Sequence, residues 1–240
     1  MKKAALLALF TVLFFTAFAN AQQCPVQGFC AFYGGDLDPN NPNTGALPNE
    51  SDPNVGGIPY GAATYQNFYN PDLIITTLFT NNLSSLNPTS GYWEIRTGVS
   101  EGNGGNLLAS GTATGYNFSH TPTTRSAFGY TEYQDLVRVG ELNIHAGTFW
   151  FTVVPIDPTG PGRSFNSNTF GLNRYGIDTP NQQFFNSAAF GKNFTNADNL
   201  GVFPTFSSGV VGTDPEPASL VLLGSGLLAA AGAAHRRILR

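Results

Sequence analysis

The sequence predicts an all-β protein: an antiparallel β-sandwich of jelly-roll or immunoglobulin-like type with long loops rich in Asn and Gly. Short segments rich in β-branched and aromatic residues recur along the body, each bounded by Gly, Pro or Asn. No body segment shows the apolar stripe of period 3.6 that predicts an amphipathic helix. Setting aside two ends with the composition of targeting segments leaves about 190 residues, which suits one domain.

Two of the strand candidates indicate how the sheets are organised. Alternation in the segment 91–96 should place Trp93 and Ile95 in the core and the intervening polar side chains in water. Residues 147–155 are apolar on both faces, which favours a central strand covered on both sides and ended by Pro155. The full set of candidates is 64–69, 72–80, 91–97, 106–115, 125–131, 136–143 and 147–155.

The N-terminus, residues 1–21, has the pattern of a secretory signal peptide. Lys2 and Lys3 precede an apolar run, residues 4–19, and an A-x-A site ends at Ala21. This pattern predicts export by the secretion machinery and cleavage before residue 22. The alternatives are cleavage two residues earlier and an uncleaved N-terminal anchor, which the shortness of the run disfavours.

Two cysteines, Cys24 and Cys30, lie just after this cleavage site. In an exported chain, their spacing predicts a disulfide that ties down the mature N-terminus. The spacing is not the C-x-x-C of redox proteins, and two cysteines alone cannot complete a zinc site.

Residues 22–59, which contain these cysteines, are predicted to be a loop region because turn formers dominate them. Asp36, Asp38 and Asn40 alternate as oxygen ligands do in calcium loops, but the Gly and Glu that an EF-hand requires farther along are absent. An Asx-rich loop is favoured over a calcium site of another class. No other cofactor is expected.

The sandwich domain should span residues 60–206. Its last part, residues 157–206, is dense in Asn, Gly, Phe and Thr and has no fixed period. The stretch 207–214 is rich in Ser and Gly and is predicted to be a linker to the C-terminal segment.

The C-terminal segment, residues 215–240, has three parts. Two prolines flanking a glutamate open it, and they delay the start of any helix. An uncharged apolar run, residues 218–234, follows; as a helix it spans about 25 Å, at the short end for a bilayer core. The positive-inside rule would hold the basic tail, residues 235–240, in the cytoplasm. A plain membrane anchor is one interpretation. The residues that define the pattern are Pro215, Glu216, Pro217, Arg236 and Arg237.

This order of parts resembles the PEP-CTERM sorting signal of Gram-negative exoproteins, in which a Pro-Glu-Pro triplet precedes a short transmembrane helix and a basic tail. The resemblance covers about a tenth of the chain and concerns sorting, not the activity of the body. It implies recognition by an exosortase, a membrane-embedded cysteine transpeptidase that cuts near the triplet. It also implies delivery to the cell surface or to extracellular polysaccharide.

The charge distribution argues against nucleic acid as a partner. All fifteen Asp and Glu residues lie between positions 36 and 216, and only six of the eleven basic residues lie among them. Phosphate groups would repel such an acidic body.

Two catalytic patterns are present, and each has a simpler explanation. Residues 98–102 spell G-x-S-x-G, and Ser100, Asp135 and His145 follow the chain order of a hydrolase triad. A nucleophile elbow needs a helix after the serine, whereas the Gly and Asn residues that follow favour a hairpin loop. Acids scattered over a β domain are normally solvated. The carboxylates that could pair as in glycosidases are Glu94, Glu132, Asp135 and Glu141.

Aromatic residues make the case for a carbohydrate-binding module. Tyr92, Trp93, Tyr130 and Trp150 could form a platform for sugar rings. The competing interpretation is stronger for the two tryptophans, since tryptophans on short strands usually belong to the core.

The sequence thus predicts an exported protein of the cell surface or extracellular matrix, structural or adhesive and without catalysis. Its C-terminal helix would anchor it in the inner membrane until processing releases it to the surface or medium. The alternatives are a carbohydrate-binding module acting on exopolysaccharide and, less favoured, a secreted hydrolase.

Overall fold

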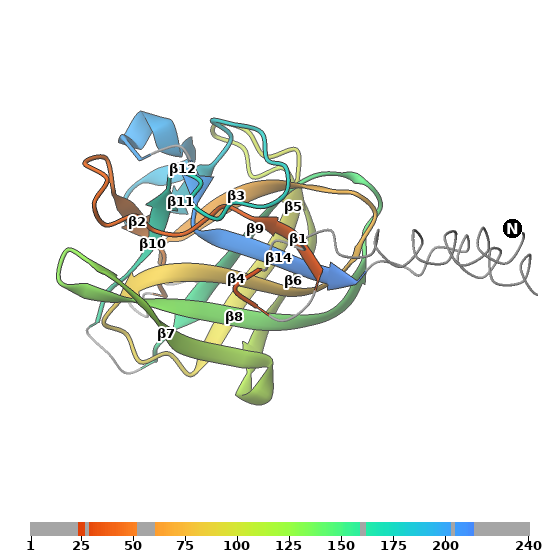
Figure 1. Ribbon diagram of the computed structural model, residues 1–240. Coiled ribbons are helices and arrows are strands. Elements are labelled where there is room, and N and C mark those ends of the chain that lie inside the picture. The colour runs from red at the N-terminus through yellow and green to blue at the C-terminus, as the bar shows by residue number, and fades with distance from the viewer. Residues whose placement is uncertain (1–23, 27–28, 52–60, 159–161, 203–204, 214–240) are drawn as a thin grey trace, which may run out of the picture.

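The computed structural model describes residues 24–26, 29–51, 61–158, 162–202 and 205–213. Within these ranges the chain is nearly all β. It forms two antiparallel sheets and two short 3-10 helices, η1 (Gly115–Asn117) and η2 (Ala197–Leu200) (Figure 1). Side chains of both sheets meet in shared clusters, an arrangement consistent with the predicted antiparallel sandwich.

The first sheet, called the β4 sheet below, has eight strands. Its central strand β4 pairs with β8 on one side and with β14 and β10 on the other. Strand β7 lies beyond β8, β1 lies beyond β14, and β2 and β13 pair with β10. The bounds are β1 Phe29–Tyr33, β2 Ala46–Pro48, β4 Ile74–Ser84, β7 Phe118–Ala127, β8 Tyr130–Asn143, β10 Ser164–Thr169, β13 Thr205–Phe206 and β14 Ser208–Thr213.

The second sheet, called the β9 sheet, has six strands in the order β12-β11-β3-β9-β5-β6. Strand β9 has β3 and β5 as neighbours, which confirms the central position predicted for residues 147–155. The bounds are β3 Ala63–Asn70, β5 Ser90–Thr97, β6 Asn106–Thr114, β9 Gly147–Ile156, β11 Phe184–Ser187 and β12 Lys192–Asn196.

One part of the space between the sheets is apolar. Phe32 and Ile75 of the β4 sheet meet Phe151 of the β9 sheet there, and all three are fully buried. Trp93 and Ile95 belong to the same cluster, as predicted. Burial of each such side chain contributes roughly 1.5–3 kcal/mol to the free energy of folding. This cluster has more residues than the other described clusters, so it is the main apolar contact between the sheets.

Side-chain amides fill another part of this space. Asn49 donates to Oδ1 of Asn82 at 3.0 Å and to the carbonyl oxygen of Val153, in the β9 sheet, at 2.8 Å. Asn166 of the β4 sheet donates to Thr64 Oγ1, in the β9 sheet, at 2.8 Å. These groups are buried, so removing one partner would cost about 1–3 kcal/mol.

The segment 207–214, predicted to be a linker, contains a strand instead. Strand β14 pairs with β1 on one side and with β4 on the other (Figure 1). A Cβ atom at Gly209 would lie 2.2 Å from the ring of Phe79, so glycine is needed for this close packing. The small residues that suggested a linker are therefore packing positions.

Two further predictions are wrong in their boundaries. The loop region 22–59 contains β1 and β2, which pair with β14 and β10. The strand predicted at 125–131 spans the turn between β7 and β8, where Phe128 and Gly129 both have positive φ.

No helix among the described residues is long and apolar enough to cross a membrane. The predicted signal peptide, residues 1–21, and the C-terminal segment 215–240 with its predicted span 218–234 lie outside the described ranges.

Candidate functional site

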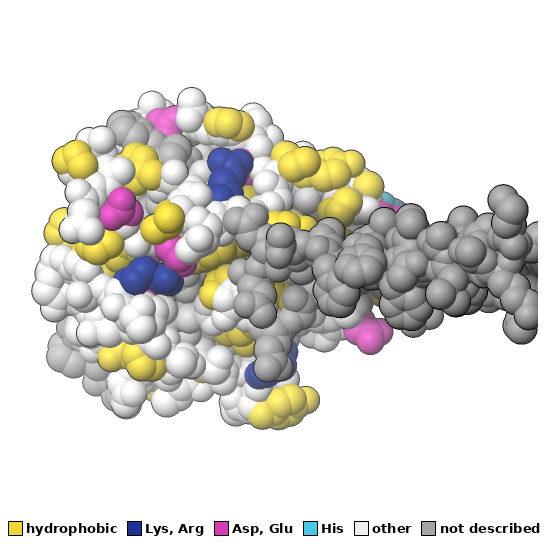
Figure 2. Space-filling view, viewed as in Figure 1, with side chains coloured by type: hydrophobic (Ala, Val, Ile, Leu, Met, Phe, Trp, Pro, Cys, Tyr) yellow, Lys and Arg dark blue, Asp and Glu magenta, His cyan; other side chains and the backbone are white. Residues whose placement is uncertain are grey.

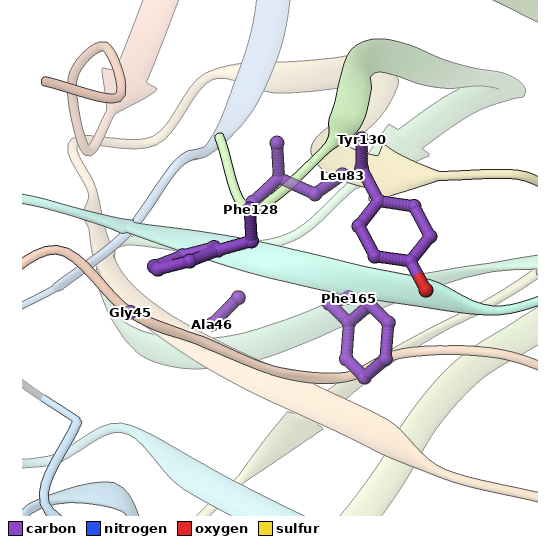
Figure 3. Close-up of a pocket in the computed structure, with 6 residues that line it drawn as sticks. All are labelled: Gly45, Ala46, Leu83, Phe128, Tyr130 and Phe165. Carbon is purple, nitrogen blue, oxygen red and sulfur yellow. The ribbon is translucent and has the colours of Figure 1, made fainter. Parts of the chain in front are cut away.

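An aromatic hollow, here named the hairpin pocket, is the candidate site. Its residues come from β4, β10, the β7–β8 hairpin and the start of β2, segments far apart in the sequence (Figure 3). None of these lining side chains is charged, so the pocket suits an uncharged ligand surface. Its volume is about 290 Å³, and it is lined by Gly45, Ala46, Leu83, Phe128, Tyr130 and Phe165.

Phe128 lies at the tip of the β7–β8 hairpin. Ala127 pairs with Tyr130, and the two residues between them, Phe128 and Gly129, have φ of 52° and 82°. A two-residue turn with positive φ at both positions matches the twist of the flanking strands and normally uses Asn or Gly. The Phe128 side chain is 65% exposed. A large ring therefore stands in solvent where a small residue would be more favourable.

Phe165 connects the pocket to charged groups at its side. The ring of Tyr130 packs edge-on against it, with 5.6 Å between ring centroids. The guanidinium of Arg163 lies 5.2 Å from the Phe165 centroid and pairs with Glu50 at 2.8 Å. An aromatic surface beside hydrogen-bond donors and acceptors is an arrangement that binds ligands with one apolar and one polar side.

The four aromatic residues predicted to form a sugar platform do not come together. Trp93 lies in the core between the sheets, and Trp150 lies in a second buried cluster, where its Nε1 donates to the Gln182 carbonyl at 2.7 Å. Tyr92 packs against that second cluster. Of the four, Tyr130 is the one that lines the hairpin pocket.

The predicted hydrolase residues are not assembled into a triad. Ser100 lies in the tight turn between β5 and β6, and the chain continues into β6 without a helix. The His145 side chain is 98% exposed, with Nδ1 at 3.6 Å from Asp72. Asp135 is buried beside His120 instead. A glycine-rich hairpin therefore accounts for the G-x-S-x-G pattern.

Asp135 and His120 form a pair that joins three strands. Asp135 Oδ1 lies 2.6 Å from His120 Nδ1, and Oδ2 accepts a hydrogen bond from Asn82 at 2.7 Å. The His120 ring stacks on Tyr133, with centroids 4.1 Å apart. Burial raises the pKa of Asp135 above its usual value, although the hydrogen bonds from His120 and Asn82 oppose the rise. Both carboxylate oxygens are engaged, so this group is part of the framework.

Glu94 is another predicted catalytic carboxylate, and it too is buried. It accepts from Arg96 Nε at 2.6 Å and from the Tyr92 hydroxyl at 2.8 Å. The prediction that Glu94 faces water is wrong. Phe194 of β12 packs over this outer face of the β9 sheet, with the Arg96 guanidinium 5.3 Å from its ring centroid.

The remaining two candidate carboxylates, Glu132 and Glu141, differ in their exposure to solvent. Glu132 is buried and accepts from Arg125 Nε at 2.6 Å and from Ser167 Oγ at 2.8 Å. Glu141 is exposed near the far end of the same strand, β8. They do not form a pair of free carboxyl groups facing one cleft.

Of the calcium candidates Asp36, Asp38 and Asn40, the first is bound by other side chains and the second is bound by the backbone of the third. Asp36 pairs with Arg125 at 2.8 Å and accepts from Asn173 at 2.7 Å. Asp38 accepts from the backbone N–H of Asn40 at 3.0 Å, which closes an Asx turn. No group of three or more His, Cys, Asp and Glu in the described ranges could hold a metal ion. A calcium ion at Asp36 would have to displace the Arg125 guanidinium.

Cys24 and Cys30 are joined by a disulfide, with 5.3 Å between their Cα atoms, which confirms the predicted pairing. Both sulfurs pack in a cluster with Tyr33 and Phe79, so the bridge holds the start of the described chain against the β4 sheet. The predicted sorting residues Pro215, Glu216, Pro217, Arg236 and Arg237 lie outside the described ranges.

Charged side chains on the face shown in Figure 2 are scattered or beside groups of opposite sign, and they form no continuous patch of one sign. The hairpin pocket remains the feature of this body best suited to ligand contact. Comparison with known proteins found no matching family model, no matching curated protein and no matching solved structure.

Proposed function

We propose that this chain is an exported protein of the cell surface or extracellular matrix, with a structural or adhesive and non-catalytic role. The observation that carries the proposal is the order of triplet, apolar run and basic tail in residues 215–240. On this proposal residues 1–21 are a signal peptide and residues 218–234 a transmembrane helix. The body is a sandwich of jelly-roll or immunoglobulin-like type, and an exosortase-type transpeptidase processes the tail.

The chemistry of the body supports a non-catalytic role. The buried carboxylates Glu94, Glu132 and Asp135 are each paired with an Arg or His and accept further hydrogen bonds. A catalytic acid or base needs access to a substrate proton, and these groups are held inside the protein by their partners. Such pairs favour a rigid framework.

The position of β14 supports processing outside the folded body. Thr213 ends this strand, and Pro215 follows two positions later. A cut near residues 215–217 would therefore leave every strand of the β4 sheet intact.

The test is Glu216→Ala in the native host, with Glu141→Ala as a matched control in an exposed carboxylate of the body. We expect Glu216→Ala to keep its C-terminal segment and stay in the inner membrane, while wild type and the control lose it and reach the surface. Unchanged mass and location of the Glu216→Ala protein would rule out a processing signal at the triplet.

A second candidate function, binding of exopolysaccharide, is supported by the hairpin pocket. Pyranose rings present faces of C–H groups that pack on aromatic rings, and the rings of Phe128, Tyr130 and Phe165 surround one hollow (Figure 3). The partly exposed guanidinium of Arg163 beside Phe165 offers N–H donors to sugar hydroxyls.

This candidate is tested by binding of the purified protein to exopolysaccharide from the same host. Tyr130→Ala should weaken binding about tenfold, which corresponds to about 1.4 kcal/mol. Tyr116→Ala is the control, because Tyr116 is 83% exposed and does not line the pocket. Equal binding by wild type and both variants would exclude a glycan site in the hairpin pocket.

A further inference from the structure

Strand β6 is an open edge of the β9 sheet. Within the described ranges it pairs with β5 alone, from Asn106 opposite Thr97 to Thr114 opposite Ser90. Along an edge strand, alternate backbone N–H and C=O groups point away from the neighbouring strand and are free to pair with another chain. Most β6 side chains are also exposed, so the faces of this strand are largely open to solvent.

Strand β6 lacks most of the features that protect sheet edges; its pairing with β5 has one register shift, which leaves Leu108 without a partner. Protected edges are short, contain proline, or carry charged side chains, above all lysine. Strand β6 is nine residues long and contains neither proline nor a charged residue. No Asp, Glu, Lys or Arg occurs between Glu101 and Arg125.

Two other edges show the contrast. Strand β7, the outermost strand beside β8, contains Pro122 and Arg125, and its pairing is irregular from Pro122 to Ser126. Strand β12, at the opposite edge of the β9 sheet, has five residues and begins with Lys192. Among these three edges, β6 is therefore the one that has nine residues and neither a proline nor a charged side chain.

Apolar surface flanks the open edge. Leu107 and Leu108 are 49% and 45% exposed. Leu108 also lines a hollow of about 170 Å³ together with Leu142 and Ile144, and the exposed Glu141 lies at the same hollow. Covering this surface would add apolar burial to any backbone pairing along β6.

We propose that β6 pairs antiparallel with β6 of a second copy of this chain, so that the two β9 sheets become one continuous sheet. A second copy is the occupant that fits best, because antiparallel pairing of a strand with itself about a twofold axis satisfies both edges at once. An uncharged strand can face its own copy without the repulsion that like charges would cause. The apolar flank of each copy is covered in the same step.

The test is disulfide cross-linking of the full-length chain in native envelopes, with a mild oxidant added. Cysteine replaces each of the 9 residues of β6, Asn106–Thr114, one at a time, so that every position for the twofold axis is covered. The native cysteines do not interfere, because Cys24 and Cys30 are already bridged. Thr131→Cys is the control, since Thr131 is exposed but lies on β8, which is paired on both sides.

The twofold axis gives the expected pattern. One residue of β6 then faces its own copy, so its cysteine variant should give several-fold more dimer than Thr131→Cys, and variants two positions away much less. Adding Thr112→Lys to the best cross-linking variant should abolish the dimer, because a lysine on an edge strand opposes pairing with another chain.

A dimer yield on β6 no greater than that of Thr131→Cys would overturn the proposal. A yield that is equal at all positions of the strand, or that survives Thr112→Lys, would also overturn it, because neither fits strand pairing. The proposed pairing involves the body and not the sorting tail. A chain that keeps its C-terminal segment should therefore form the same cross-link as a processed chain. The outcome of this test is thus independent of the outcome for Glu216→Ala.

Discussion

Phe128 combines an unfavourable backbone conformation with a ring that is exposed to solvent. Its φ of 52° lies in the left-handed region, which costs a side-chain-bearing residue roughly 1–2 kcal/mol, and its ring is 65% exposed. Unfavourable backbone conformations tend to persist where the residue serves a function. This combination is why we place the candidate ligand contact at the hairpin tip.

Phe128→Gly should therefore separate stability from binding. Glycine adopts this φ without steric cost, so the variant should be more stable by about 0.5–1 kcal/mol while exopolysaccharide binding weakens. Thermal unfolding and the binding assay measure the two effects. Ala127→Gly, one residue earlier in β7, is the control and should lose stability. If Phe128→Gly lost as much stability as Ala127→Gly, the prediction would be wrong, and packing of the Phe128 ring would stabilise the fold.

Asp135 should make stability depend on pH. Burial raises the pKa of this carboxyl above 3.8, so the folded protein holds the proton more tightly than the unfolded chain does. The resulting stabilisation is fully present below the unfolded pKa and is lost as pH rises through the folded pKa. Asp135→Asn should flatten this decline in melting temperature. Glu141→Gln, at an exposed carboxyl, is the control. Parallel pH profiles for wild type and Asp135→Asn would contradict the assignment.

Among the elements, β14 depends most on a single small residue. Gly209→Ala would bring a Cβ atom against the ring of Phe79 and the backbone of β1, so we expect a loss of about 1–3 kcal/mol in the free energy of unfolding. Gly147→Ala is the matched control, because its Cβ would make ordinary contacts at 3.4–3.5 Å. Equal melting temperatures for the two variants would show that β14 can shift to accept a side chain.

The strands that can be predicted from the sequence are those in which apolar and polar side chains alternate or in which nearly all side chains are apolar. Strand β9 and the inward positions Trp93 and Ile95 follow from pattern alone, because the β9 sheet is buried by apolar contacts there. Strands β10 and β14 do not follow from pattern. Buried amides hold Asn166 of β10 in place, and close ring packing selects Gly209 of β14. Local composition suggests loops for both, and only tertiary contacts make them strands.

The candidate site was predictable only in part. Tyr130 is one of the four aromatic residues predicted to contact sugar rings, and it lines the pocket. Phe128 and Phe165 were not, although an aromatic residue directly before Gly129 in a hairpin turn is a signal that could have been used. The pocket needs the pairing of β10 with β4 and the turn of the β7–β8 hairpin, and no local pattern specifies how these meet.

At the scale of the whole molecule, the body combines a disulfide, buried ion pairs and an amide network between its sheets. These interactions hold the two sheets and the start of the described chain in place. Such a body is compatible with the structural or adhesive role proposed above. Pairing through β6 would extend those contacts from one molecule to two.

The most direct test of this account is the intact mass of the protein recovered from native cell envelope and medium. We predict a mature chain that starts near Gln22, ends near residues 215–217 and has lost residues 218–240. Recovery of a chain that still carries residues 218–240 in both fractions would contradict the account and leave a body held by an unprocessed C-terminus.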